Sequence, residues 1–307
     1  MQIRHSILVI SYAQEDLIAD CLDSILNQSV SPYEVIVIDD CSPDRTWEVI
    51  ESYALNNPVI KVHRNRHNLG VFGNFNKIIK LATGDFVNIV AGDDLLPSGI
   101  LEKYNEFIAA KQLDCNTPFQ VFTNSLVLKP DGSRIFKNNQ VNFQKNMFEI
   151  CVFHCFWSWD TGISIGLLRK MDGIREDLGY QADLLWHIDK VINSSDNLFL
   201  NEVGYIYRAN VGVSVATKYK EHLQSKRKVV SEIFRKYPEY VTPKIQKYLE
   251  FDDLWIAYNA RPSFRTYCSF LLGYLHNMPF RKNSIHRNPC KVLLPIWLKN
   301  IILRIIR

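Results

Sequence analysis

The sequence has no run of 18 uncharged residues, although 47% of its 307 residues are hydrophobic. A helix that crosses a bilayer needs about 20 mostly apolar residues, so we expect none. The chain starts MQIRH and leads straight into a strand-like run, without the apolar stretch or the cleavage site of a secretion signal. We therefore expect a cytoplasmic globular protein of one or two domains.

A C-x-x-C pair is also absent, and the seven cysteines are scattered and odd in number. This excludes a small disulfide scaffold. Cys151, His154 and Cys155 have the spacing of one helix face and could hold a metal ion. Their neighbours are aromatic, however, and no fourth ligand is in view. We therefore predict buried, reduced thiols.

The net charge of +4 conceals two parts of opposite sign. Residues 1–217 hold 18 Lys and Arg against 26 Asp and Glu, whereas residues 218–307 hold 18 against 6. An acidic body with a basic tail points to two different partners. Because the body is acidic, we expect no nucleic acid among them.

The basic tail ends in a helical pattern, Lys291–Arg307 (KVLLPIWLKNIILRIIR). On a helical wheel its polar residues gather within about 140° and most of its apolar residues take the rest. That pattern is typical of a helix that lies on an anionic membrane surface. The alternative is a terminal helix packed on the body with a basic rim.

The first 125 residues alternate short apolar runs with helical patterns. The predicted strands are residues 6–11, 33–39, 59–63, 85–90 and 119–128. The predicted helices are 16–28, 42–53, 73–82 and 97–111, with Ser42 as an N-cap, Pro43 in the first turn and Gly84 after the third helix. This order predicts an α/β fold, a doubly wound, mostly parallel sheet with helices on both faces. Later residues predict a helix at 183–193, strands at 198–203 and 205–209, and helices from 218 on.

Polar clusters follow four of these strands, where open α/β sheets bind ligands. They are S-Y-A-Q-E (11–15), D-D-C-S-P-D-R-T (39–46), N-L-G with N-F-N (68–70 and 74–76), and A-G-D-D (91–94). Any one of these clusters could be an ordinary turn, but four of them at strand ends in this order are far less likely to arise by chance. The paired carboxylates Asp93 and Asp94 suit Mg²⁺ or Mn²⁺, which takes one or two carboxylates and completes its shell with water and phosphate.

These four motifs resemble, in order and spacing, those of family 2 glycosyltransferases of the GT-A fold, over roughly residues 5–210. The resemblance implies inverting transfer of a sugar from a UDP-sugar, with Mn²⁺ or Mg²⁺ held by Asp94 and Asp93, and with Asp40 against the uracil ring. The nucleotide-sugar site it implies comprises Ser11, Tyr12, Glu15, Asp40, Asn68, Gly70, Asn76 and Asp93. The chain departs from the family at Ala91, often a carboxylate, and at Phe75, often an arginine.

The resemblance also places a general base in an acidic segment that begins a helix, where Asp183 is the match. One carboxylate there takes the proton of the attacking acceptor hydroxyl. Ala182 is a further departure, since many members have Glu at that position. Asp177 and Glu176 are alternatives for the base, and Asp183 could instead only stabilise the helix start.

The resemblance implies an acceptor wall at residues 153–160, where Trp157 and Trp159 could stack on a sugar beside Asp160. Core packing of these aromatic residues is the alternative. We predict a catalytic domain at 1–217, with a nucleotide-sugar half (1–125) and an acceptor half (126–217), and a membrane-associating helical region at 218–307. The expected acceptor is a lipid-diphosphate-linked sugar of O-antigen or capsule, met at the inner face of the cell membrane.

Two rival functions make different demands. A nucleotidyltransferase or a dinucleotide dehydrogenase needs a glycine-rich phosphate loop after the first strand, and residues 11–16 contain no glycine. A non-catalytic nucleotide-sugar-binding or scaffold protein would not need Asp40, Asp93, Asp94 and Asp183 together.

Overall fold

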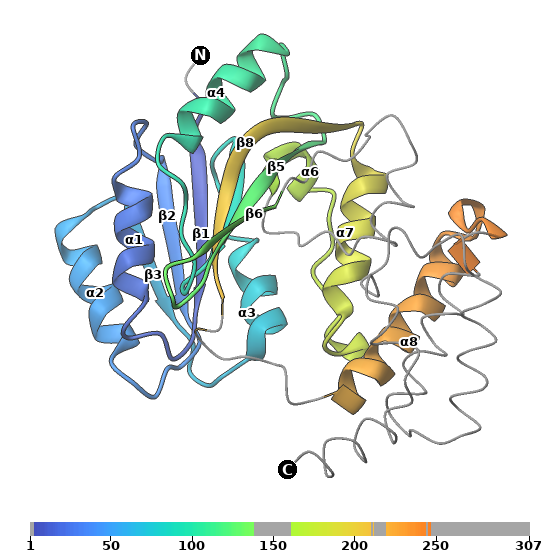
Figure 1. Ribbon diagram of the computed structural model, residues 1–307, viewed down its shortest axis with the longest axis horizontal. Coiled ribbons are helices and arrows are strands. Elements are labelled where there is room, and N and C mark those ends of the chain that lie inside the picture. Colours follow the sequence, from blue (N-terminus) through green and yellow to red (C-terminus); the bar gives the residue numbers. More distant parts are fainter. Residues whose placement is uncertain (1–2, 138–160, 210, 212–218, 244, 247–307) are drawn as a thin grey trace, which may run out of the picture. The chain divides into compact units, whose positions relative to one another are not determined.

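The computed structural model describes residues 3–137, 161–209, 211, 219–243 and 245–246 (Figure 1). The chain divides into two compact units. The first comprises Met1–Met147, Trp157–Glu176 and Trp186–Val215, and the second Phe148–Phe156, Asp177–Leu185 and Ala216–Arg307. Residues 177–185 group with the second unit, and the predicted domain boundary at 217 stays a prediction.

The first unit is built on one sheet. Its strands are β1 (His5–Ser11), β2 (Glu34–Asp39), β3 (Ile60–Arg64), β4 (Phe86–Ala91), β5 (Phe119–Leu128), β6 (Arg134–Lys137), β7 (Thr161–Ser164) and β8 (Asp196–Arg208). Their order is β3-β2-β1-β4-β7-β5-β6, with β8 paired to β5. The pairs among β1 to β4 and the β5–β8 pair are parallel, while β6 and β7 run antiparallel to β5. This confirms the predicted mostly parallel sheet.

The helices are α1 (Ile18–Leu26), α2 (Thr46–Asn56), α3 (Gly70–Ile78), α4 (Ile100–Ala110), α6 (Ile165–Leu168), α7 (Ala182–Asn193) and α8 (Tyr219–Lys236). Short 3-10 helices, η2 and η3, cover Glu176–Leu178 and Pro238–Tyr240. Helices α1, α2 and α4 share one buried cluster with the sheet. Helix α3 contacts β1 and β2 but contributes no residue to that cluster. The sheet is therefore covered on both faces, as predicted.

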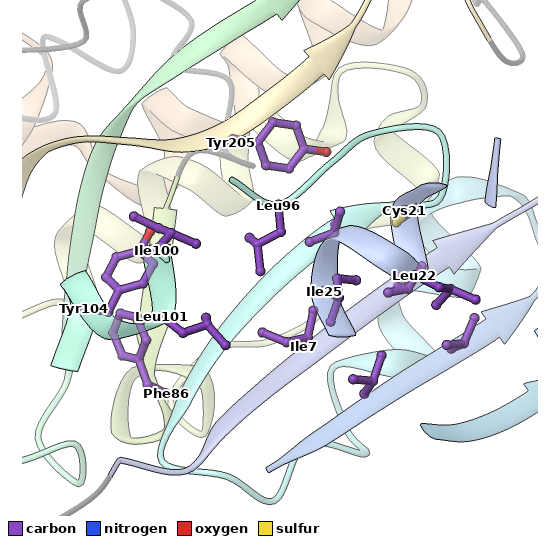
Figure 2. Packing of buried hydrophobic residues seen from close by; sticks show 14 of the residues in the cluster. Ile7, Cys21, Leu22, Ile25, Phe86, Leu96, Ile100, Leu101, Tyr104 and Tyr205 are labelled. Atoms are coloured by element: carbon purple, nitrogen blue, oxygen red, sulfur yellow. The ribbon is translucent and has the colours of Figure 1, made fainter. Parts of the chain in front are cut away.

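The core follows from the strand pattern, because alternate residues of a strand face opposite sides of the sheet. Ile7 of β1 faces Leu22 and Ile25 of α1 in this cluster (Figure 2). Phe86 lies under Tyr104 of α4, with ring centroids 5.0 Å apart. Burial of these side chains, each fully enclosed, fixes the register of the sheet and therefore the positions of the strand ends.

The amino ends of the strands carry a fully paired carboxylate. Glu34, which starts β2, is completely buried. It accepts hydrogen bonds from Ser6 Oγ at 2.7 Å, Lys61 Nζ at 2.6 Å and Thr83 N at 2.7 Å. Burial alone would raise the pKa of Glu34, but these donors outweigh it and lower the pKa to about 2.

Three local predictions were wrong. Helix α2 begins at Thr46, not after Ser42, because the Ser42 hydroxyl donates to Asp39 and the Asp44 carboxylate accepts from Thr46 N. Helix α3 begins at Gly70 and ends at Ile78, well before Gly84. The two strands predicted at 198–209 form the single strand β8, whose irregular pairing with β5 takes up a bulge.

Several sequence predictions lie outside the described residues. They are the acceptor wall with Trp157, Trp159 and Asp160, the Cys151/His154/Cys155 group, and the amphipathic segment 291–307. None of the described helices has the length and hydrophobicity that crossing a lipid bilayer requires.

Candidate active site

The motif loops meet at the carboxyl edge of the sheet. Ser11 of β1 is in register with Asp39 of β2, and Ile10 is in register with Ala91 of β4. Asp39 is in turn in register with Arg64 of β3. The loops that follow these four strands are therefore neighbours, as the parallel order predicted.

The first two loops are hydrogen-bonded to each other. Ala13 N donates to Ser42 Oγ at 3.0 Å, Gln14 N to Thr46 Oγ1 at 2.7 Å, and Glu15 N to Asp44 Oδ2 at 3.2 Å. Glu15 returns the contact, since its Oε2 accepts from Arg45 N at 2.9 Å. The two loops therefore form one preorganised surface.

Backbone strain marks the same two loops. Ala13 and Cys41 have φ values of +54° and +61°, a region that residues other than glycine rarely adopt. Such strain persists only where surrounding contacts hold it, and it is common at functional sites. Ser11 is buried against Gln14, whereas Tyr12 between these positions is partly exposed.

Asp40 ties the second loop to the third. Its Oδ1 accepts from Asn65 Nδ2 at 2.7 Å and from Leu69 N at 2.9 Å, and its Oδ2 accepts from Gly70 N at 2.9 Å. Asn68 Oδ1 also accepts from Gly70 N, at 2.8 Å. Asp40 therefore fixes the loop that begins helix α3, and its predicted contact with a uracil ring stays a prediction.

The fourth loop is held by a strand from far along the chain. Asp94 is buried; its Oδ2 accepts from Tyr205 Oη at 2.7 Å and its Oδ1 from Arg208 N at 2.8 Å. The Arg208 guanidinium bonds the Asp93 carbonyl, Asp20 Oδ2 at 2.9 Å and Leu17 O at 2.8 Å. The end of β8, which lies beside β5 in Figure 1, thus clamps the Asp93–Asp94 turn.

The two carboxylates of this turn differ in their surroundings. Burial and the adjacent Asp93 charge raise the pKa of Asp94 to about 7, against the opposing effect of the Tyr205 hydrogen bond. Burial also raises the pKa of Asp93. Asp93 is partly exposed, whereas both oxygens of Asp94 are already bonded within the protein. Asp93 is therefore the carboxylate of the pair that a ligand can reach.

A divalent cation fits this donor set. The described residues contain no group of three metal-binding side chains. Mg²⁺ and Mn²⁺ nevertheless often use one or two protein carboxylates, and take their other oxygens from water and phosphate. Asp93 offers such a carboxylate beside Gly92, where any side chain would collide with Ile18 Cδ1 at 2.8 Å. Glycine at position 92 therefore lets the turn pack directly against the first loop and helix α1.

The remaining predicted residues lie elsewhere. Asn76, on α3, bonds the backbone of Ile174 and is close to Glu176. Asp183 lies in the first turn of α7, where Leu184 N donates to its Oδ1 at 3.0 Å. It belongs to the second unit and Asp93 to the first. The base role of Asp183 accordingly stays a prediction.

Sequence reasoning missed Tyr205 and Arg208. The sequence predicts both only as part of a short strand, and nothing in their spacing connects them to a motif more than 100 residues earlier. The available signal was the composition of the strand end, since an arginine at the end of a half-buried strand needs acceptors.

A family model described as glycosyl transferase family 2 matches residues 6–159, which is half of the chain. The chain belongs to glycosyl transferase family 2. This confirms the family that the motifs predicted, and the protein is a glycosyltransferase.

Two curated relatives illustrate the range of the family. This glycosyltransferase is 27% identical over 250 residues to the uncharacterized glycosyltransferase EpsJ of Bacillus subtilis, covering 76% of this chain and 70% of EpsJ. It is 33% identical over 112 residues to the poly(ribitol-phosphate) beta-glucosyltransferase of Bacillus spizizenii, covering 36% of this chain and 18% of that protein.

Solved structures share the fold. TarS of S. aureus aligns with a TM-score of 0.63 at 18% identity, over 93% of this glycosyltransferase and 50% of TarS. A complex of TarS residues 1–349 with UDP-GlcNAc gives 0.60 at 18% identity, over 93% of this chain and 82% of that one. The mannosyltransferase PcManGT of Pyrobaculum calidifontis, with GDP-Man and Mn²⁺, gives 0.57 at 18% identity, over 92% and 83%. The predicted GT-A-type fold is thereby confirmed.

Proposed function

We propose that this glycosyltransferase moves a sugar, with inversion, from a UDP-sugar to a hydroxyl of a lipid-linked sugar acceptor in the synthesis of a bacterial surface polysaccharide. The observation that carries the proposal is the carboxyl edge of the sheet. There two cross-bonded loops, the Asp40-anchored loop and the accessible Asp93 carboxylate are neighbours.

The donor is assigned from this edge and from a relative. Polar and acidic side chains gather at this edge, where an open α/β sheet binds its ligand. A structurally similar protein, TarS residues 1–349, has been solved with UDP-GlcNAc, which supports a UDP-sugar here. Ser11, Tyr12, Glu15, Asn68 and Gly70 line or shape the loops that would hold it.

A divalent cation, Mn²⁺ or Mg²⁺, would be held by Asp93, with Asp94 directly behind it. The structurally similar PcManGT carries Mn²⁺ together with its nucleotide sugar, which supports the assignment. Such a cation would neutralise the charge that develops on the leaving diphosphate. Asp94, fixed by Tyr205 and Arg208, would hold the turn so that Asp93 can reach the donor.

Asp183 would act as the general base. A carboxylate beside the acceptor accepts the hydroxyl proton while the oxygen attacks the anomeric carbon, opposite the diphosphate. The partly exposed side chain of Asp183, at the start of α7, suits this role.

The acceptor class rests on relatives and on the tail. A related enzyme carries the name poly(ribitol-phosphate) beta-glucosyltransferase, and this supports a polymer as the product. The 18 basic residues of 218–307 would draw the protein to the anionic inner face of the membrane, where a lipid-linked acceptor resides.

The test is a panel of nucleotide sugars incubated with the full chain, a lipid-diphosphate-linked sugar and Mn²⁺. We expect transfer from one UDP-sugar, with release of UDP, and no transfer in chelator. Release of pyrophosphate would indicate a nucleotidyltransferase instead. Tight UDP-sugar binding without transfer or hydrolysis would identify a non-catalytic binding protein.

The base has its own test in Asp183→Asn. This variant should bind UDP like the wild type but turn over roughly 10²–10⁴-fold more slowly, the usual contribution of a positioned base. The wild type should lose activity as the pH falls through the pKa of the base, and the residual activity of the variant should lack that limb. If Asp183→Asn stays active, the base is Asp177 or Glu176, which the same substitution to the amide would identify.

A further inference from the structure

We propose that Asn76 is a positioning residue, which holds the segment before the predicted base against helix α3, and that it is not a ligand of the nucleotide sugar. The inference rests on the proposed function, because it concerns the segment that leads to Asp183. It replaces the role that the sequence resemblance gave to Asn76.

The side-chain amide of Asn76 pairs with one residue in both directions. Its Nδ2 donates to Ile174 O at 2.8 Å, and Ile174 N donates to its Oδ1 at 2.6 Å. The same Nδ2 lies 3.3 Å from Glu176 Oε1. An asparagine amide has two N–H groups and one oxygen, so these contacts use both donors and the acceptor atom. Little hydrogen-bonding capacity is left for a donor sugar.

The backbone at Gly173 and Ile174 lies unusually close to the Asn76 side-chain amide. A Cβ on Gly173 would lie within 2.7 Å of Asn76 Cγ, closer than real carbon atoms approach. Only glycine therefore lets the backbone come close enough for Ile174 to pair with Asn76 in both directions. Gly173 and Asn76 act as two halves of one contact.

The neighbouring residue on α3 makes a second anchor. Phe75 is buried and meets Trp186 of α7 edge to face, with centroids 4.9 Å apart and planes at 82°. Trp186 Nε1 donates to Asp172 O at 3.0 Å. Phe75 and Asn76 thus contact Trp186 and Ile174, which lie near the two ends of the stretch from Asp172 to Trp186.

This stretch contains the predicted base. Asp183 lies three residues before Trp186 on the same helix, which begins at Ala182. Because α3 begins at the loop that Asp40 holds, its contacts with Ile174 and Trp186 fix the two points of the chain between which Asp183 lies. A displacement of a catalytic group by about 1 Å lowers the rate of the chemical step roughly 10²-fold. It need not change the affinity for the donor.

The experiment compares Asn76→Ala with Val71→Ala, an exposed position on the same helix. UDP affinity is measured by calorimetry with Mn²⁺, and kcat and KM by sugar transfer with the full chain. We expect Asn76→Ala to keep UDP affinity and the donor KM within about two-fold while kcat falls roughly 10–100-fold. Val71→Ala should match the wild type in each measurement.

A second variant guards against a merely unfolded protein. Gly173→Ala displaces the segment from the other side and should give the same pattern, normal UDP affinity with reduced kcat. In both variants the amide of Ile174 should exchange hydrogen faster than in the wild type. A ten-fold loss of UDP affinity in a folded Asn76→Ala variant would overturn the proposal and return Asn76 to the donor site.

This outcome is separable from the proposed function. If the wild type transfers no sugar, UDP affinity and Ile174 exchange still decide whether Asn76 contacts the nucleotide or the segment. If Asp183→Asn proves active, the base assignment fails while the Asn76 result stands.

Discussion

Two buried carboxylates at opposite edges of the sheet, Glu34 and Asp94, have pKa values shifted in opposite directions. At the amino edge, Glu34 receives bonds from Lys61, Ser6 and Thr83, and its pKa falls to about 2. At the carboxyl edge, burial beside a second carboxylate raises the pKa of Asp94 to about 7. The amino edge is electrostatically satisfied by the protein alone.

The Asp93–Asp94 turn at the carboxyl edge is not satisfied in this way. Asp93 and Asp94 are adjacent carboxylates. The guanidinium of the nearby Arg208 donates to Asp20 and to the carbonyls of Leu17 and Asp93, and not to either of these two carboxylates. Stability is therefore built at one edge, while negative charge is gathered at the other, where a cation and a diphosphate would complete it. Three substitutions test this difference.

Asp93→Asn should have the largest effect. It removes the accessible carboxylate but keeps the size of the side chain, so we expect sugar transfer to fall roughly 10³-fold, about 4 kcal/mol of barrier. Thermal stability without metal should not fall, because a repulsion with Asp94 is relieved. Initial rates and melting curves measure both quantities. Near-native transfer in chelator would contradict the metal role of Asp93.

Tyr205→Phe should have an intermediate effect, since it breaks the clamp but leaves both carboxylates. Asp94 Oδ2 loses its donor in a buried site, which costs roughly 1–3 kcal/mol of folding free energy. We expect transfer to drop about ten-fold as the turn loosens. Tyr33→Phe, the same change at an exposed position near the amino edge, is the control and should match the wild type. Equal activity and stability of the two variants would contradict the proposal that Tyr205 holds the Asp93–Asp94 turn.

Glu34→Gln should leave activity unchanged and affect only stability. Because the folded pKa of Glu34 lies below its ordinary value, its contribution is present above about pH 4.5 and is lost as the pH falls towards 2. The contribution is about 2 kcal/mol once screening at the half-exposed Lys61 is allowed for. Unfolding curves at pH 7 and pH 3 should show a gap between wild type and variant that closes in acid. A gap that widens in acid would refute this role.

Much of the fold followed from the sequence because it depends on local patterns. Buried parallel strands are short apolar runs, and strand β5 was predicted at its observed bounds. Parallel order alone then brought the four motif loops to one edge. The helix starts were harder, since Ser42 is a good N-cap by composition but its hydroxyl is used by Asp39.

The parts of the site that escaped prediction depend on tertiary contacts. Tyr205 and Arg208 reach Asp94 across more than 100 residues, and Asn76 reaches Ile174 across 98. In each case a polar side chain in a motif, or at a strand end, serves another part of the protein. Residue type and spacing are the same whether such a side chain binds a ligand or a backbone.

The central claim is that the carboxyl edge binds a nucleotide diphosphate through a cation at Asp93. Calorimetric titration of UDP, with and without Mn²⁺, into the wild type, Asp93→Asn and Glu34→Gln tests it most directly. We predict that Mn²⁺ tightens UDP binding at least ten-fold in the wild type and in Glu34→Gln, and not in Asp93→Asn. The same tightening in Asp93→Asn would contradict the claim.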